Sequence, residues 1–300
     1  NIDKSFLPWK DESSTDRVVR ADKGAVFALM AHIYAWEGKY DSCAMACDSV
    51  INSGSYDLLP GADYKNIYNG QSDEGIFEIA QNSTSEAMNA TQYSASIAYY
   101  TLAGPILPVN TVPNWQIDAS KLNTLYNDTN DIRYKSEFSS LLSGNVTYYY
   151  CTKYSNIQTI ANNGVNYYLS TNNIIIFRLA DILLLKAEAL AAQSSPDYAD
   201  ALQLVNQIRE RAGISSINAV NGRTALIDSI TSERGRELYL EGSRFYDLVR
   251  NERLTGVSQF PFITQSQFVA GKYYWPLDPS LFTLNPLLNQ TPYWSQLLTN

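Results

Sequence analysis

The sequence of 300 residues has one histidine, three cysteines and no long uninterrupted apolar segment. Its longest apolar run, residues 174–185, is broken by Arg178 and Asp181, whereas a membrane-spanning helix needs roughly 18 apolar residues. Basic residues are also few: the chain has 22 Lys and Arg residues and 30 Asp and Glu residues, which give a net charge of −8. The sequence therefore predicts no transmembrane helix and no nucleic-acid partner, since phosphates attract a basic surface.

The scarcity of histidine and cysteine also limits the chemistry. A serine or cysteine triad would need His32 as its base, but His32 lies on the apolar face of a predicted helix, where we interpret it as a hydrogen-bonded packing residue. Cys43 and Cys47 are one helical turn apart, so we expect small core residues rather than a disulfide. No C-x-x-C or H-E-x-x-H spacing occurs. We therefore predict no catalytic residue, no metal and no cofactor.

One acidic loop is a candidate for binding calcium. Residues 127–131 place oxygen ligands in a row, as a calcium loop does. They lack the turn glycine and the terminal bidentate glutamate of such a loop. We interpret this segment as a solvated capping loop, with calcium binding as the alternative.

Apolar residues at spacings of three and four predict helices in two pairs. The first pair covers residues 25–36 and 40–52, and the second covers 175–193 and 200–211, followed by one long helix over 224–250. Helical hairpins of this kind are the units that tetratricopeptide arrays stack. The predicted fold class is therefore all-α, or α-dominated, and tetratricopeptide-like. The residues expected on inward faces include Leu29, Ile33, Leu226, Ile230, Leu238, Phe245 and Leu248.

Between the helical pairs lies a long segment without helical periodicity. It is rich in Asn, Ser, Gly and Tyr, and only short runs such as 75–80 and 147–151 look like strands. A loop-rich stretch of this length in a compact chain is usually functional. The C-terminal segment contains five prolines, which exclude long helices, and we expect it to wrap the helical body. We predict a single domain, residues 1–300, with a helical scaffold at 17–56 and 172–250, a loop-rich insertion at 57–171 and a wrapping tail at 251–300.

Charged residues recur every three or four positions along the predicted long helix, where such neighbours can pair. Two carboxylates for glycoside hydrolysis would be the catalytic interpretation, but acids one turn apart on one helix do not flank a bond. A hydrolase would instead need opposed acids in the insertion, such as Asp118 and Glu137. We therefore predict a structural ion-pair lattice formed by Glu233, Arg234, Glu237, Glu241, Arg244 and Asp247.

Aromatic residues concentrate in the insertion, beside amide side chains. A sugar ring has an apolar face and a hydroxyl rim, so a sugar receptor needs flat aromatic platforms surrounded by amide donors and acceptors. Most of these tyrosines are expected to be ordinary surface residues. Trp115 is the strongest candidate, because it lies in a polar turn. The residues predicted to contact a glycan are Trp115, Asn114, Gln116, Tyr99, Tyr100, Tyr148 and Tyr149.

A set of segments in fixed order resembles the SusD/RagB family, the surface glycan-binding lipoproteins of Bacteroidetes. The similarity covers nearly the whole chain, although Leu281-Phe282 depart from the Glu-Ile usual in the family. The matching segments are residues 20–58, Glu74 to Ile79 (EGIFEI), Asp131-Ile132-Arg133, Phe177 to Ala189 (FRLADILLLKAEA), Ala201 to Gly213 (ALQLVNQIRERAG), Glu233 to Arg250 (ERGRELYLEGSRFYDLVR), 274–279 and 285–293.

The resemblance implies a non-catalytic protein that captures oligosaccharides or polysaccharides as nutrients and passes them to a SusC-like, TonB-dependent transporter. It also implies a location on the cell surface at the outer membrane, held by a lipid anchor outside this sequence. The family's N-terminal portion is missing, so the chain looks like the C-terminal part of such a protein or an unusually short relative. Sugar contacts lie in variable loops of the family, so the candidate residues rest on composition and loop placement alone. The alternatives are a helical-repeat scaffold that binds peptides and a glycoside hydrolase.

Overall fold

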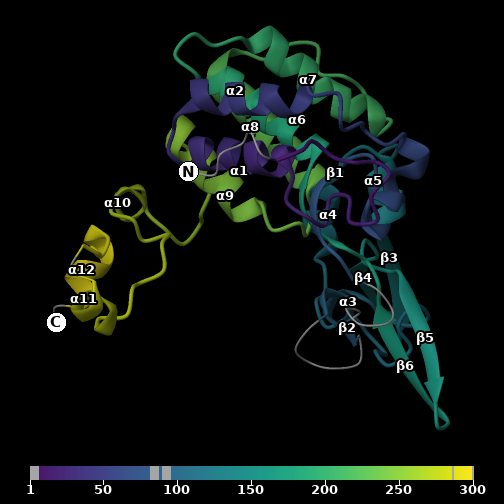
Figure 1. Cartoon of the computed structure of the whole chain (residues 1–300). Coiled ribbons are helices and arrows are strands. Elements are labelled where there is room, and N and C mark those ends of the chain that lie inside the picture. Colours follow the sequence, from purple (N-terminus) through teal and green to yellow (C-terminus); the bar gives the residue numbers. More distant parts are fainter. Residues whose placement is uncertain (1–6, 82–87, 90–95, 286, 299–300) are drawn as a thin grey trace. The chain divides into compact units, whose positions relative to one another are not determined.

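The computed structural model describes residues 7–81, 88–89, 96–285 and 287–298. The chain forms two compact units, Asn1–Arg244 and Phe245–Asn300, and each is described by itself (Figure 1). Helices are the main secondary structure, in agreement with the predicted α-dominated class. Among the described residues, no helix is both long and apolar enough to span a membrane.

Five helices form the body of the first unit. Helix α1 (Lys23–Trp36) packs against α2 (Tyr40–Ile51), and α2 packs against α6 (Leu179–Ala192). Helix α6 in turn contacts α7 (Tyr198–Arg211) and α8 (Gly222–Glu237), so α6 lies at the centre of the bundle (Figure 1). Its burial follows from its sequence, because 12 of its 14 residues are buried. The two predicted helical pairs are thus present.

The buried face of α1 differs from the predicted one. Leu29 and Ile33 are 48% and 47% exposed, so their assignment to the inner stripe was wrong. The residues that face α2 and the core are instead small. They recur with the same helical period as Leu29 and Ile33, so periodicity alone could not show which of the two faces is buried. Small side chains allow the helices to approach closely, and the predicted small core residues Cys43 and Cys47 are indeed buried. The buried alanines of α1 are Ala25, Ala28, Ala31 and Ala35.

A short strand pair precedes α6, where a helix was predicted. Strand β7 (Ile174–Arg178) pairs antiparallel with β1 (Gly75–Ile79), so the helix predicted from residue 175 begins only at Leu179. Three consecutive β-branched isoleucines favour an extended backbone over a helix here. The strand predicted at 75–80 is confirmed as β1.

The predicted long helix over 224–250 is wrong, because two helices take its place. Helix α8 ends at Glu237, and α9 (Arg244–Thr255) begins after a turn. Within that turn Leu240 and Gly242 have φ angles of 59° and 87°, which an α-helix does not accommodate. Phe245, predicted to be internal, is 42% exposed.

The part of the insertion that the structure describes begins with a 3₁₀ helix (Gly61–Asn69) and includes three short α-helices. These are α3 (Ile97–Thr101), α4 (Ala119–Leu125) and α5 (Ile132–Glu137). Asp131 caps α5 by accepting from the backbone N–H of Arg133 at 3.0 Å. The capping role predicted for residues 127–131 is therefore observed, but Asp131 is 1% exposed and so is not solvated.

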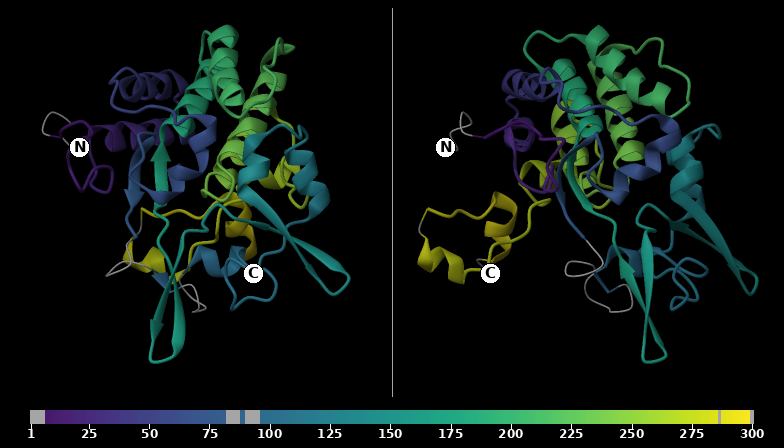
Figure 2. Two further views of the ribbon diagram at one scale, coloured as in Figure 1. Left: turned by 90° about the vertical axis from the view of Figure 1, so that its right-hand side faces the viewer. Right: turned by 45° about the vertical axis from the view of Figure 1, so that its right-hand side comes forward.

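Two β-hairpins complete the insertion and project from the helical body (Figure 2). Strands β3 (Phe138–Ser143) and β4 (Val146–Cys151) form one, which includes the predicted run 147–151. Strands β5 (Ile157–Asn162) and β6 (Val165–Ser170) form the other, and β2 (Met88–Asn89) adds to β6. The second hairpin was not predicted, although its turn has the Asn-Gly pair typical of two-residue hairpin loops, with both φ angles positive.

The insertion is fixed to the bundle at the C-terminal end of α8. The last carbonyls of a helix lack intrahelical partners and need donors from elsewhere. Here the carbonyls of residues 236, 237, 239 and 240 accept hydrogen bonds from insertion side chains at 2.6 to 3.1 Å. The end of α8 therefore positions the insertion. The donors are Tyr126, Tyr64, Lys153 and Tyr154.

The second unit consists of short helices joined by irregular segments. It holds α9 from its second residue onward, α10 (Gln265–Val269), α11 (Ser280–Leu284) and α12 (Pro292–Leu298). The absence of long helices in the tail agrees with its prolines. Trp275, in this unit, is 89% exposed.

Candidate functional site

Trp115 lies in the polar turn between α3 and α4 and exposes half of its surface. Its side chain is 50% exposed, and its ring stacks on Tyr100 with centroids 5.0 Å apart and an interplanar angle of 22°. The backbone N–H of Trp115 donates to the carbonyl of Tyr100 at 2.7 Å, which holds the two residues in register. Tyr99 packs edge-on against Tyr100 at 5.3 Å. The turn thus presents a supported indole rather than a buried one.

Two asparagines fix the backbone around this indole. Asn114 donates through Nδ2 to the carbonyl of Tyr99 at 2.9 Å. Asn110 is buried, and its Nδ2 donates to the carbonyls of Tyr99 and Leu102 at 2.7 and 3.0 Å. Beneath them, Leu102 packs in a buried cluster with Ala98, Leu107 and Tyr150. A rigid support of this kind keeps the aromatic stack in place.

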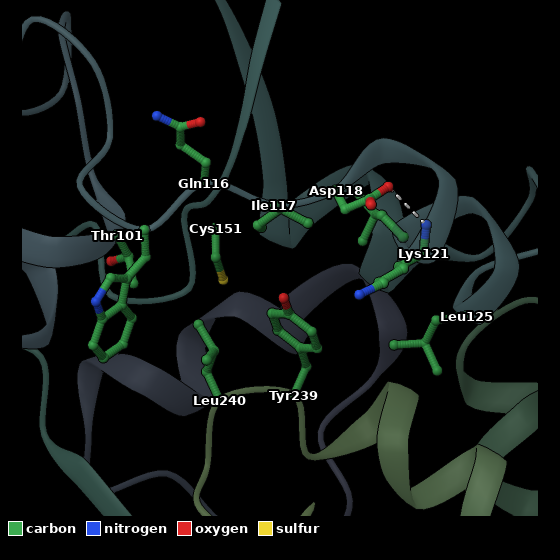
Figure 3. A pocket seen from close by; sticks show the side chains of 11 residues that line it. Thr101, Gln116, Ile117, Asp118, Lys121, Leu125, Cys151, Tyr239 and Leu240 are labelled. Carbon is green, nitrogen blue, oxygen red and sulfur yellow. Dashed lines mark hydrogen bonds between the residues drawn. The ribbon is translucent and has the colours of Figure 1, made fainter. Parts of the chain in front are cut away.

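A cavity of about 410 Å³ lies beside Trp115, and its walls are mostly apolar. Figure 3 shows its side chains, with Cys151 from β4 pointing toward Tyr239 and Leu240 from the turn after α8. Burial raises the pKa of the Cys151 thiol to about 12, so at neutral pH it is a neutral wall residue and not a nucleophile. The residues that line the cavity are Thr101, Trp115, Gln116, Ile117, Asp118, Lys121, Leu122, Leu125, Cys151, Tyr239 and Leu240.

The cavity has two charged residues, Asp118 and Lys121. Asp118 caps α4, and its Oδ1 accepts from the hydroxyl of Ser120 at 2.7 Å and from the backbone N–H groups of Ser120 and Lys121 at 2.8 and 3.3 Å. These hydrogen bonds, the Ser120 hydroxyl first, hold the pKa of Asp118 below its usual value. Asp118 is therefore an ionised helix cap.

The structure separates the two predicted tyrosines of β4. Tyr149 accepts at its carbonyl from the N–H of Ile117 at 3.1 Å, so its backbone adjoins the segment that follows Trp115. Tyr148 pairs with Leu141 on β3, and its side chain points to the opposite face of the strand. Both are half-buried. Within the described residues, neither tyrosine lines the cavity.

Sequence reasoning missed the scaffold side of the cavity. Tyr239 and Leu240 lie more than a hundred residues after Trp115, and no local signal links them. Lys153, which is fully buried, holds this turn by donating from Nζ to the carbonyl of Tyr239 at 2.6 Å. On the insertion side of the cavity, the Asp-Ala-Ser pattern at Asp118 is a local sequence signal, typical of a helix start.

The acids of α8 and the turn after it take part in a buried ion-pair network. Glu237 pairs with Arg178 at 2.6 Å, with Arg133 at 2.9 Å and with Arg211. Burial alone would raise the pKa of Glu237, but these three arginines hold it well below its usual value. Glu241 also pairs with Arg178, at 2.8 Å. Most partners lie on other elements, so the network joins the insertion, the strand pair and α8.

Of the other residues assigned to the lattice, Glu233 joins the same network through Arg133, whereas Arg234, Arg244 and Asp247 have other partners. Glu233 pairs with Arg133 at 2.7 Å, and Arg234 pairs with Asp181 on α6 at 2.7 Å. Arg244 donates to the carbonyl of Thr231 at 2.8 Å, beside Gly235. Asp247 pairs with Arg250 within α9 at 2.7 Å.

The two acids named for a hydrolase are not equally accessible. Asp118 is exposed, whereas Glu137 is 0% exposed and lies 3.3 Å from the ammonium of Lys153. Burial raises the pKa of Glu137 to about 7, partly offset by Lys153. Glycoside hydrolysis needs two carboxyl groups that both reach the sugar. A fully buried Glu137 does not meet that requirement.

His32 has a partner inside the bundle. Its Nε2 lies 2.8 Å from Oδ2 of Asp181, and its ring stacks on Phe177 with centroids 5.2 Å apart. This is the hydrogen-bonded packing role that the sequence predicted. Across the described part of the chain, no three histidine, cysteine, aspartate or glutamate side chains are grouped to hold a metal ion.

The chain belongs to the SusD family, because the model of that family matches residues 84–294. It is similar to SusD-like protein P2 of Formosa agariphila, with 26% identity over 271 residues that make up 81% of this chain and 53% of that protein. SusD-like protein P38 of the same organism is 39% identical over 135 residues, which are 42% of this chain and 25% of that protein. The resemblance found in the sequence is thereby confirmed.

Solved structures share the fold. A SusD homologue from Bacteroides thetaiotaomicron has a TM-score of 0.75 and 30% identity, covering 96% of this chain and 63% of that one. Surface glycan-binding protein A from the same organism has a TM-score of 0.67 at 21% identity, covering 96% and 67%, which shows the fold alone. The chain thus spans less than two thirds of the first of these structures, and about a quarter and a half of the two curated relatives. SusD-like proteins are known as surface glycan-binding proteins.

Proposed function

We propose that this chain is part of a non-catalytic glycan-binding protein of the cell surface, and that Trp115 is the platform on which a sugar ring stacks. The observation that supports it most is the half-exposed indole, stacked on Tyr100 beside a cavity of about 410 Å³. An apolar ring face fits the indole, and the hydroxyl rim fits the amides of Asn114 and Gln116.

The proposal includes the rest of the uptake system. A tetratricopeptide-like helical scaffold presents the insertion, and captured oligosaccharide passes to a SusC-like, TonB-dependent transporter in the outer membrane. A lipid anchor outside this sequence holds the protein at the surface. Family membership supports this assignment.

Binding is expected to be weak. Two or three ring contacts contribute roughly 1 kcal/mol each, and hydrogen bonds add to them, while association costs at least about 4 kcal/mol. Dissociation constants between about a micromolar and a millimolar follow. Weak capture suits a protein that must release its ligand to a transporter.

Affinity gel electrophoresis and calorimetry against a panel of polysaccharides test the proposal. Trp115→Ala is expected to weaken binding about fivefold or more, and Trp115→Phe to keep part of it, because a smaller platform remains. Trp275→Ala is the matched control, since it removes an indole that is even more exposed, at 89%, from the second unit. Binding that is unaffected by Trp115→Ala would remove this residue from the site.

A further inference from the structure

Charged residues are nearly absent from the two parts of the insertion that carry the Trp115 turn and both hairpins. Residues 79–117 and 138–171 together comprise 73 residues, of which two, Glu86 and Lys153, are charged. At the chain's average of 17%, a segment of that length would carry about 12 charged residues. Glu86 lies outside the described residues.

Lys153 does not bring charge to the surface. Its side chain is 0% exposed, and its Nζ lies 2.9 Å from Glu241 and 3.3 Å from Glu137. The same ammonium lies 4.7 Å from the centre of the Tyr68 ring. Its charge is therefore neutralised inside the molecule.

The two hairpins within these segments are nevertheless largely exposed, so burial does not explain why they lack charge. Most residues of β5 and β6 are exposed, and the hairpins project from the helical body (Figure 2). On one face Ile160 and Tyr167 lie opposite each other, 38% and 40% exposed. Protein surfaces in contact with water alone normally carry many charges. Depletion of charged residues together with enrichment of aromatic ones is typical of a surface that contacts a binding partner.

The cavity beside Trp115 has the same character. Its charged residues, Asp118 and Lys121, are of opposite sign and three positions apart, so the cavity has no net charge. Asp118 is already engaged as the cap of α4. The remaining lining residues are uncharged.

We propose that the ligand of the Trp115 site is an uncharged polysaccharide, whose hydroxyl groups are bound by amides and tyrosines. This inference rests on the proposed function and narrows its ligand class. Sites for uronates or sulfates supply arginine or lysine to the anion, because desolvating an unpaired charge is costly. Neutral hydroxyls need only the donors and acceptors that the insertion provides. The affinity of the chain for such a polysaccharide should therefore depend little on salt concentration.

The test uses pairs of polysaccharides that differ only in charge. Polygalacturonate is compared with its carboxyl-reduced form, and a sulfated galactan with its desulfated form, alongside starch and neutral β-glucans. Calorimetry and affinity gels are run in low and high salt on the wild-type chain, Trp115→Ala and Lys121→Gln. We expect retention by neutral polymers, less than about a twofold change in affinity with salt, and no loss in Lys121→Gln.

The outcomes separate this inference from the proposed function. The contrary result is that the charged member of a pair binds equally or more tightly, with binding that salt weakens about tenfold and that Lys121→Gln abolishes. That result would overturn the proposal that the ligand is uncharged. If that binding were also lost in Trp115→Ala, the proposed glycan site would stand. Retention by no polysaccharide of either kind would overturn both.

Discussion

At the scale of single residues, the contacts of Trp115 with its neighbours hold its indole in a half-exposed position. Tyr100 covers one part of the ring, and the backbone hydrogen bond between the two residues fixes their separation. Asn110 and Asn114 then tie the turn to the carbonyl of Tyr99. An indole held in this way loses little conformational freedom on binding, which favours contact with a flat ligand.

Glu137 gives a residue-scale prediction about pH. Burial raises its pKa from 4.5 to about 7, so the folded chain binds a proton that the unfolded chain releases. The stability from this carboxyl is fully present below pH 4.5 and is lost as the pH rises to about 7. Relative to Glu137→Gln, the wild type should lose up to about 1.4 kcal/mol of unfolding free energy per pH unit across this window. Urea unfolding at several pH values measures it, and parallel pH profiles for the two proteins would contradict it.

At the scale of elements, the ion-pair network joins segments that are distant in sequence. Arg178 stands at the junction of β7 and α6 and contacts Glu74, Glu237 and Glu241 at 2.6 to 2.8 Å. The arginine is 0% exposed, so its removal leaves three buried carboxylates with fewer partners. The network therefore holds the strand pair to the end of α8.

Replacing this arginine should be strongly destabilising. Arg178→Met is expected to lower the free energy of unfolding by about 3 to 5 kcal/mol, measured by urea denaturation. The matched control is Arg20→Met, because the side chain of Arg20 is 83% exposed and pairs only at the surface with Asp16. That variant should change stability by less than about 0.5 kcal/mol. Similar losses in both variants would show that the network does not hold the elements together.

Helices were predicted well where the apolar residues kept the helical period over a long segment and where capping or breaking residues marked the helix ends. It failed where tertiary contacts decided the outcome, as in α1, whose alanine and leucine faces have the same period. The break between α8 and α9 depends on backbone angles at Leu240, where a leucine gives no warning of a left-handed conformation. Tyr239 reaches the cavity because Lys153 holds its carbonyl, a contact that no local pattern encodes. The candidate turn at Trp115 could be chosen from composition, but its cavity could not.

At the scale of the whole molecule, the charged residues and the aromatic surface lie in two different regions of the first unit. The helical bundle and the ion-pair network contain most of the buried charges that the structure describes, while the two charge-poor parts of the insertion carry the aromatic turn and the hairpins. Hydrogen bonds from Lys153 and Tyr154 to the turn after α8 connect the two regions. This division supports a rigid scaffold that presents a neutral, aromatic surface to a glycan.

Fluorine NMR of the chain labelled with 5-fluorotryptophan tests the central claim most directly. The five tryptophans give separate probes, and Trp115→Phe assigns the resonance of Trp115. On titration with oligosaccharides from whichever polysaccharide the affinity gels retain, we predict that the Trp115 resonance shifts in a saturable way while that of Trp275 stays in place. A saturable shift at other tryptophans, with the Trp115 resonance unchanged at full saturation, would contradict the claim that a glycan binds on this indole.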